Sequence, residues 1–128
     1  MYLDTDVILA HLKADDWLSS VVDLETLNEP KTSVATCIEV QYAREGEWER
    51  ERLTRVSNQL EADGIELISL EVSHVETGSE LQRKYAKLNL FDAVHLGTAK
   101  VLEETIVSTD TLYPEIEEVE SVDPRELQ

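Results

Sequence analysis

Cysteine, glycine and proline are all scarce in this sequence, which has one, four and three of them among 128 residues. A single cysteine excludes an intrachain disulfide, so we interpret Cys37 as a small buried apolar side chain. The chain also lacks the run of about 18 apolar residues that a membrane-spanning helix needs, and its first residues lack the basic start of a signal peptide. These absences predict a soluble, cytoplasmic protein without a membrane partner.

Basic residues are also few. Lys and Arg total 11 against 28 Asp and Glu, which gives a formal net charge of −17, and the acids are spread through every segment. At ordinary ionic strength such a surface repels itself and repels nucleic acid, whereas in molar salt the Debye length shrinks to about 3 Å and both effects largely vanish. The composition is typical of proteins from a salt-rich cytoplasm, such as that of a halophilic archaeal cell. The alternative is an ordinary acidic protein with a basic partner.

Short β-like runs alternate along the chain with longer helical patterns. The predicted strands are Tyr2–Thr5, Thr32–Ala35, Ile65–Leu70, Thr105–Thr109 and Val119–Val122. The predicted helices are Val7–Lys13, Asp16–Leu27, Thr36–Arg44, Glu47–Asp63, Val72–Leu88 and Leu90–Leu102. This alternation is typical of a parallel sheet with helices on both faces. We predict one α/β domain over residues 1–128, a three-layer sandwich around a mainly parallel sheet of four or five strands.

Three of these helices carry apolar patterns that predict which side is buried. The helix Leu90–Leu102 is apolar nearly all round, so we expect it to be buried. The expected inner side chains of the other two are Trp48, Leu53, Val56 and Leu60 in one helix, and Val75, Leu81, Tyr85 and Leu88 in the next. Gly64 is a helix stop signal.

Acidic side chains stand where the first two strands pass into helices. Asp4 and Asp6 lie at the start of the first helix, and Glu39 lies near the start of the helix after the second strand. Ligands of an open parallel sheet bind outside the carboxyl ends of its strands. Each acid also has a structural explanation, because Asp4 or Asp6 could cap the first helix. Glu39 could complete a capping box with Thr36.

Two further acids fall at equivalent places later in the chain. Asp110 directly follows the fourth predicted strand, and Asp92 lies near the N-terminus of the most apolar helix. Asp110 could simply open a turn, and Asn89 could cap the helix whose dipole favours Asp92. Carboxylates brought together at one edge would repel one another and favour a hard cation such as Mg²⁺ or Mn²⁺. The shared topology therefore predicts a divalent metal site.

Four short segments, in a fixed order and spread over nearly the whole chain, carry these acids. They are MYLDTDVIL, TSVATCIEV, NLFDAVHLGTA and IVSTD. Each segment alone is short, but together they resemble the blocks of PIN domains. The acids that match the blocks are Asp4, Glu39, Asp92 and Asp110, and Ser108 stands before the last of them.

The resemblance implies a PIN-like fold and a metal-dependent endoribonuclease that cleaves single-stranded RNA or structured RNA loops. It implies catalytic and metal-binding roles, with Mg²⁺ or Mn²⁺, for Asp4, Glu39, Asp92 and Asp110. Asp6 falls where the family varies, and we rank it with Ser108 as a supporting residue. Many stand-alone PIN domains of this size are VapC-type toxins. That similarity implies an antitoxin protein and a second copy of the chain as partners, beside the RNA substrate.

Three alternative functions stay open at this point. In a haloacid-dehalogenase-like phosphatase, Asp4 would be a nucleophile and Asp6 a general acid, but no lysine follows a later strand convincingly. A receiver domain would need an acid at the end of the third strand, where Ser69 and Leu70 stand instead. A catalytically inactive PIN module would act only as a binding partner. Retention of all four block acids argues against that module.

The remaining polar and aromatic residues give weaker signals. His95 lies on the most apolar helix and is interpreted as a satisfied core side chain rather than a ligand. Ser108 or Thr36 could orient a carboxylate or a water. The arginines Arg44, Arg50, Arg52 and Arg55 could contact RNA phosphates, although a solvated, salt-paired helix face explains them better. Trp17 and Trp48 are interpreted as core or dimer contacts.

The net charge generates a prediction about salt. Because added salt screens self-repulsion, the midpoint of thermal unfolding should rise as KCl is increased from dilute to molar concentration. Unfolding followed by circular dichroism across a KCl series measures this. A midpoint that stays flat or falls with salt would contradict the salt-adaptation hypothesis.

Overall fold

The protein is built around one parallel sheet. A computed structural model describes residues 1–13, 22–43 and 50–127. The strands β1 (Tyr2–Leu3), β2 (Lys31–Ser33), β3 (Glu66–Ile68), β4 (Ile106–Val107) and β5 (Ser121–Val122) pair in the order β3-β2-β1-β4-β5, and every pairing is parallel. All five predicted strands are therefore present, although each is shorter than predicted. The predicted fold class is confirmed.

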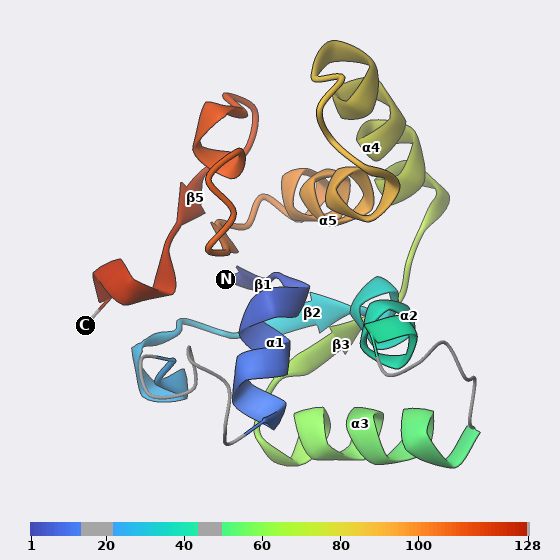
Figure 1. Ribbon diagram of the computed structural model, residues 1–128, viewed down its shortest axis with the longest axis vertical. Coiled ribbons are helices and arrows are strands. Elements are labelled where there is room, and N and C mark those ends of the chain that lie inside the picture. The colour runs from blue at the N-terminus through green and yellow to red at the C-terminus, as the bar shows by residue number, and fades with distance from the viewer. Residues whose placement is uncertain (14–21, 44–49, 128) are drawn as a thin grey trace.

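Helices cover both faces of this sheet, which makes a three-layer sandwich (Figure 1). The α-helices are α1 (Thr5–Leu12), α2 (Val34–Ala43), α3 (Arg50–Ala62), α4 (Val72–Lys84) and α5 (Leu90–Val101), and the 3-10 turns are η1 (Leu24–Thr26), η2 (Tyr113–Glu115) and η3 (Pro124–Leu127). In Figure 1, α4 and α5 lie on one side of the strands while α1 and α3 lie on the other. None of the described helices combines the length and the apolar character that a membrane crossing requires.

The core is divided by the sheet because successive side chains of a strand point to opposite faces. Tyr2 of β1 and Ile106 of β4 pack with Leu96 and Ala99 of α5. Their neighbours Leu3 and Val107 pack on the other face with side chains of α1, α2 and α3, namely Val7, Ile8, Val40 and Leu60. Cys37 is buried and free, as predicted. The central strands are thus buried on both faces, as is usual for parallel sheets.

Two glycines let α4 and α5 approach closely. A Cβ placed on Gly97 would lie 2.5 Å from the backbone nitrogen of Gly78 and 2.5 Å from the carbonyl oxygen of His74. A Cβ on Gly78 would lie 2.6 Å from the carbonyl oxygen of Ala93. These distances are shorter than any van der Waals contact, so both positions require glycine. The crossing holds α5, which carries Asp92, close against α4.

Several predicted helix details are wrong. Residues 16–21 of the predicted helix Asp16–Leu27 lie outside the described ranges, and the rest forms only the 3-10 turn η1. There the Asp23 carboxylate accepts a hydrogen bond from the Glu25 N–H at 3.0 Å, which offers the backbone an alternative to a helix. Helix α4 ends at Lys84 rather than at the predicted Leu88. The stop signal at Gly64, by contrast, agrees with the structure, because α3 ends at Ala62 and Gly64 has a φ of 79°.

Some side chains predicted to be buried are exposed. Val75 is 50% exposed because α4 packs on α5 through Gly78 and Leu81 instead. Leu53 is 36% exposed, whereas Leu60 of the same helix is fully buried. Helix α5 is buried along its middle but exposes Leu90 near its start. An apolar pattern alone does not show which side a helix turns toward its neighbours.

The glycine crossing gives a prediction about stability. Gly97→Ala should lower the free energy of unfolding by about 1 to 3 kcal/mol, because the added methyl group must push α4 away from α5. This loss is expected even though alanine is intrinsically the better helix former by about 1 kcal/mol. Urea unfolding at fixed salt measures it. Ser79→Ala, at an exposed position of α4, is the matched control, and an equal effect of both substitutions would contradict the packing account.

Candidate active site

Asp4 is a buried carboxylate at the point where β1 passes into α1. It occupies the N-cap position, but its side chain makes no capping hydrogen bond. Instead the Ser108 hydroxyl donates to Asp4 Oδ2 at 2.7 Å, which links the ends of β1 and β4. The pKa of Asp4 is raised to about 6, mainly by burial and also by the neighbouring Asp6, while His95 and the Ser108 hydrogen bond act in the opposite direction. The N-cap explanation of this acid is therefore wrong.

Glu39 faces into the same region from α2. This helix begins at Val34, so Thr36 lies inside it and bonds the Thr32 hydroxyl at 2.7 Å. The predicted capping box between Thr36 and Glu39 does not form. Glu39 Oε1 instead accepts hydrogen bonds from the Thr5 hydroxyl at 2.5 Å and from Nε2 of His95.

His95 connects Glu39 to a buried polar chain. Nδ1 of His95 lies 2.6 Å from the Tyr2 hydroxyl, which donates to the Ser33 hydroxyl at 2.8 Å. Because a carboxylate can only accept, Nε2 carries the proton that faces Glu39. His95 is 1% exposed and hydrogen bonded at both nitrogens, which agrees with a satisfied core side chain. However, Nε2 bonds to Glu39, one of the predicted site acids, so His95 also orients that carboxylate.

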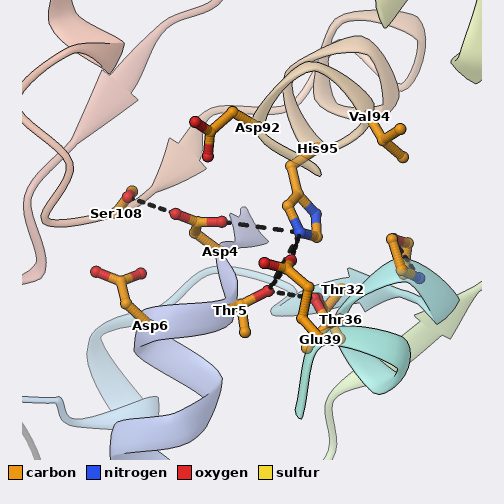
Figure 2. A network of polar contacts seen from close by, with 12 residues as sticks. Asp4, Thr5, Asp6, Thr32, Thr36, Glu39, Asp92, Val94, His95 and Ser108 are labelled. Carbon is orange, nitrogen blue, oxygen red and sulfur yellow. Dashed lines mark hydrogen bonds and ion pairs between the residues drawn. The ribbon is translucent and has the colours of Figure 1, made fainter. Parts of the chain in front are cut away.

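Asp92 enters the region from the first turn of α5. The side chain of Asn89 caps this helix by accepting from the Asp92 N–H at 2.9 Å, as predicted. The hydroxyl of buried Tyr113 donates to Asp92 Oδ1 at 3.0 Å. Burial raises the pKa of Asp92, and the nearby Asp110 and Glu39 carboxylates raise it as well. Figure 2 shows the Asp92 side chain pointing from α5 toward Asp4.

Tyr113 lies among the acids as a neutral hydrogen-bond donor. Burial raises the pKa of its hydroxyl, and the charges of Asp4, Asp92 and Asp110 raise it further. The proton is thus retained and can be donated to Asp92. Nothing in the sequence marks Tyr113, because it lies beyond the last block acid in a 3-10 turn.

Asp6 and Asp110 are each held by the backbone near the end of β4. Asp6 Oδ2 accepts from the Thr109 N–H at 2.9 Å and from the Thr109 hydroxyl, and Asp6 Oδ1 accepts from the Val7 N–H. Asp110 Oδ1 accepts from the Leu112 N–H at 2.9 Å, which is the turn-opening role foreseen for it. Figure 2 shows Asp6 turned away from His95 and Glu39.

The predicted acids thus come from four segments to one edge of the sheet, the carboxyl ends of β1, β2 and β4. Among the residues that the structure describes, no group of three His, Cys, Asp or Glu side chains is arranged to hold a metal ion as it stands. Separate hydrogen-bond donors hold Asp4, Glu39 and Asp92. Carboxylate oxygens remain the donor type that Mg²⁺ and Mn²⁺ prefer.

Comparison with known proteins identifies the family. The family model for the PIN domain matches residues 1–119. The chain belongs to the PIN domain family. No curated protein matches the sequence.

Solved structures with a similar fold include three PIN-like relatives of low sequence identity. A chain of a toxin–antitoxin complex from Klebsiella pneumoniae is 22% identical, with a TM-score of 0.70 and 96% of each chain covered. A chain of VapBC2 from Rickettsia felis, bound to a promoter DNA fragment, is 15% identical with a TM-score of 0.69, over 95% of this chain and 96% of that one. DNA-bound VapBC from Salmonella typhimurium gives 19% identity, a TM-score of 0.69 and 96% coverage of each chain. These likenesses support the PIN fold.

Sequence reasoning missed the residues of this PIN domain that hold the acids in place. Tyr2 and Thr5 stand beside Asp4 in the first block, yet their positions suggested only strand and helix. Thr5 donates a hydrogen bond directly to Glu39, whereas Tyr2 contacts His95, which in turn contacts Glu39. These residues are far apart in the sequence, so no local pattern indicates the contacts. Trp17, Trp48 and Arg44 lie outside the described residues.

The raised pKa of Asp4 predicts how pH affects stability without metal. Between its ordinary pKa of 3.8 and about pH 6, Asp4 stays protonated in the folded protein but ionises in the unfolded chain. The free energy of unfolding therefore falls as the pH rises through this window. Asp4→Asn removes this cost. The stability of the variant relative to wild type should grow by up to about 3 kcal/mol from about pH 4 to about pH 7.

Urea unfolding at several pH values, with chelator and constant high salt, measures this difference. The constant salt keeps screening of the remaining carboxylates equal at each pH. If wild type and Asp4→Asn differ by the same amount at every pH, Asp4 is not a destabilised buried carboxylate.

Proposed function

We propose that this PIN domain is a metal-dependent endoribonuclease that cleaves single-stranded RNA or structured RNA loops. The observation that carries the proposal is the placement of buried Asp4 at one sheet edge with Glu39 and Asp92, each pointing into one region from a different element. The raised pKa values of Asp4 and Asp92, caused first by burial and also by neighbouring carboxylates, indicate that keeping these acids ionised at this edge costs free energy. A bound cation would offset that cost.

Asp4, Glu39 and Asp92 would hold a Mg²⁺ or Mn²⁺ ion, with Asp110 beside them. The donor set fits such an ion because it consists of carboxylate oxygens and lacks thiolates, which softer metals prefer. When bound, the ion supplies Lewis-acid activation of a water and of the scissile phosphate. Ser108, Tyr113 and His95 with Thr5 orient the acids, each through a hydrogen bond to one carboxylate oxygen. Asp6, bound by Thr109, is a supporting residue.

We further propose that the protein is the toxin of a toxin–antitoxin pair. Support comes from the solved structures of similar fold, which are toxin–antitoxin and VapBC complexes. A cavity of about 340 Å³ between α1, α2 and α3 would accept an amphipathic segment of an antitoxin, since apolar side chains (Leu9, Leu12, Val40 and Val56) line it together with Arg52, Arg55 and Gln59. A homodimer is also proposed. It would cover apolar side chains exposed on α4 and α5, among them Val72, Val75 and Leu90.

The three alternative functions no longer have equal support. The phosphatase and receiver interpretations lose their support because the matching family model is that of the PIN domain. An inactive PIN module that only binds a partner remains the rival, and an activity assay distinguishes it.

Cleavage of single-stranded RNA tests the proposal. The wild type should cleave with Mg²⁺ or Mn²⁺ and stop when chelator is added. Asp4→Asn and Asp92→Asn should each lower kcat by about a hundredfold or more, because each replaces a charged ligand by a weaker neutral one. Asp6→Asn should cost less than either. High salt is expected to stabilise the acidic protein but weakens phosphate contacts, so rates are compared at one KCl concentration.

Glu76→Gln is the control, since it removes one negative charge from an exposed site on α4. Circular dichroism establishes that every variant is folded. A folded wild type that cleaves no RNA with either metal would favour the inactive binding module. Equal cleavage by Asp4→Asn would also refute the metal-dependent assignment.

A further inference from the structure

The distribution of positive charge relative to the acids points to a place for RNA that the site residues do not include. Between Glu80 and Asp92 the sequence has no acidic residue, and this is the longest stretch of the chain without one. It reads LQRKYAKLNLF and carries Arg83, Lys84 and Lys87. In a chain of net charge −17, an approach for a polyanion must lie where the local charge is positive. This stretch ends at Asp92 itself.

The structure places these cations on the surface. Helix α4 ends at Lys84, and the following turn leads to Asn89, the cap of α5. Arg83, Lys84 and Lys87 are exposed. Lys84 pairs with Glu118 at 3.3 Å, whereas no described acid forms an ion pair with Lys87. Lys87 is thus available to a phosphate.

An apolar cavity of about 460 Å³ opens beside Lys87. Its walls are Tyr85, Ala86, Lys87, Leu112 and Glu115. Tyr85 is held in place because its hydroxyl donates to Glu118 Oε1 at 2.6 Å, so its ring is a fixed wall rather than a mobile side chain. An aromatic ring and an aliphatic side chain beside a lysine form the combination that binds a nucleobase and its phosphate, although the cavity also carries the carboxylate of Glu115.

The cavity is tied to the candidate active site through both of its walls. Leu112 donates its N–H to Asp110 Oδ1 at 2.9 Å, and the next residue, Tyr113, donates its hydroxyl to Asp92. The opposite wall, at Tyr85 to Lys87, continues through Asn89 to Asp92. Both walls of the cavity are therefore joined, within a few residues, to side chains that contact Asp92 or Asp110.

We infer that the cavity between Tyr85 and Leu112 is a subsite for one nucleobase of a single-stranded RNA, with Lys87 binding the adjacent phosphate. The inference rests on the proposed ribonuclease function and specifies where its substrate binds. Sequence tolerance is expected, because every base presents an aromatic face and the cavity walls offer few hydrogen-bonding groups.

RNA binding without cleavage tests the subsite. The probe is a 5′-fluorescein-labelled single-stranded RNA about 12 nucleotides long, followed by fluorescence anisotropy with chelator present. Tyr85→Leu, which removes the ring, should raise Kd about tenfold. Lys87→Gln should reduce the slope of log Kd against log salt by about 0.7, the value for one phosphate contact with a single strand. Tyr85→Phe keeps the ring but loses its hydrogen bond to Glu118, so its Kd should stay closer to that of the wild type than the Kd of Tyr85→Leu.

Lys100→Gln is the matched control, because Lys100 is an exposed lysine of α5 that does not line the cavity. An unchanged Kd in Tyr85→Leu together with an unchanged salt slope in Lys87→Gln overturns the subsite, as does an equal change in Lys100→Gln. Cleavage measured in parallel separates the two proposals. If the wild type cleaves RNA while both variants bind normally, only the subsite fails. If the wild type neither binds nor cleaves RNA, both fail.

Discussion

The structure depends on the cost of bringing like-charged carboxylates together at the end of a parallel sheet. Asp4 lies at the end of β1 with little contact with water, and Asp92 and Glu39 approach it from α5 and α2. Each acid is stabilised by a separate neutral or imidazole donor, from Ser108, Tyr113 or His95. These donors do not offset the whole cost, since burial, with a smaller contribution from the charge of Asp6, keeps the pKa of Asp4 raised to about 6. In the proposed function, a divalent cation would supply the missing compensation.

The fold meets this cost with rigid elements around the acids. Parallel pairing of β1 with both β2 and β4 brings their carboxyl ends to one edge. The glycine crossing holds α5 close to α4, so Asp92 is carried by a buried helix rather than by a loop. The donors come from every layer, with Tyr2 on β1, His95 on α5 and Thr5 on α1. The apolar packing on both faces of the sheet offsets the free energy that the clustered acids cost.

Much of the fold could be predicted from the sequence, and less of the site. All five strands were predicted from short runs that contain β-branched residues, and the signal is clearest for β4, which is apolar and fully buried. The buried faces of the helices were harder to predict. The apolar pattern of α4 alone places Val75 inward, whereas the glycine contact with α5 turns it outward. The positions of Asp4 and Asp92 followed from topology. The Glu39 capping box was wrong because α2 begins two residues earlier than predicted, and the tyrosine donors were missed because their contacts span distant segments.

The central claim is that Asp4, Glu39 and Asp92 form one divalent metal site. Titration of Mn²⁺ into the metal-free protein, followed by the loss of the free-ion electron paramagnetic resonance signal, tests it without RNA. The account predicts saturable binding by wild type that is weakened about tenfold or more in Asp4→Asn and in Asp92→Asn, with a smaller change in Asp6→Asn. Equal Mn²⁺ binding by wild type and Asp4→Asn, with both proteins folded, would contradict it.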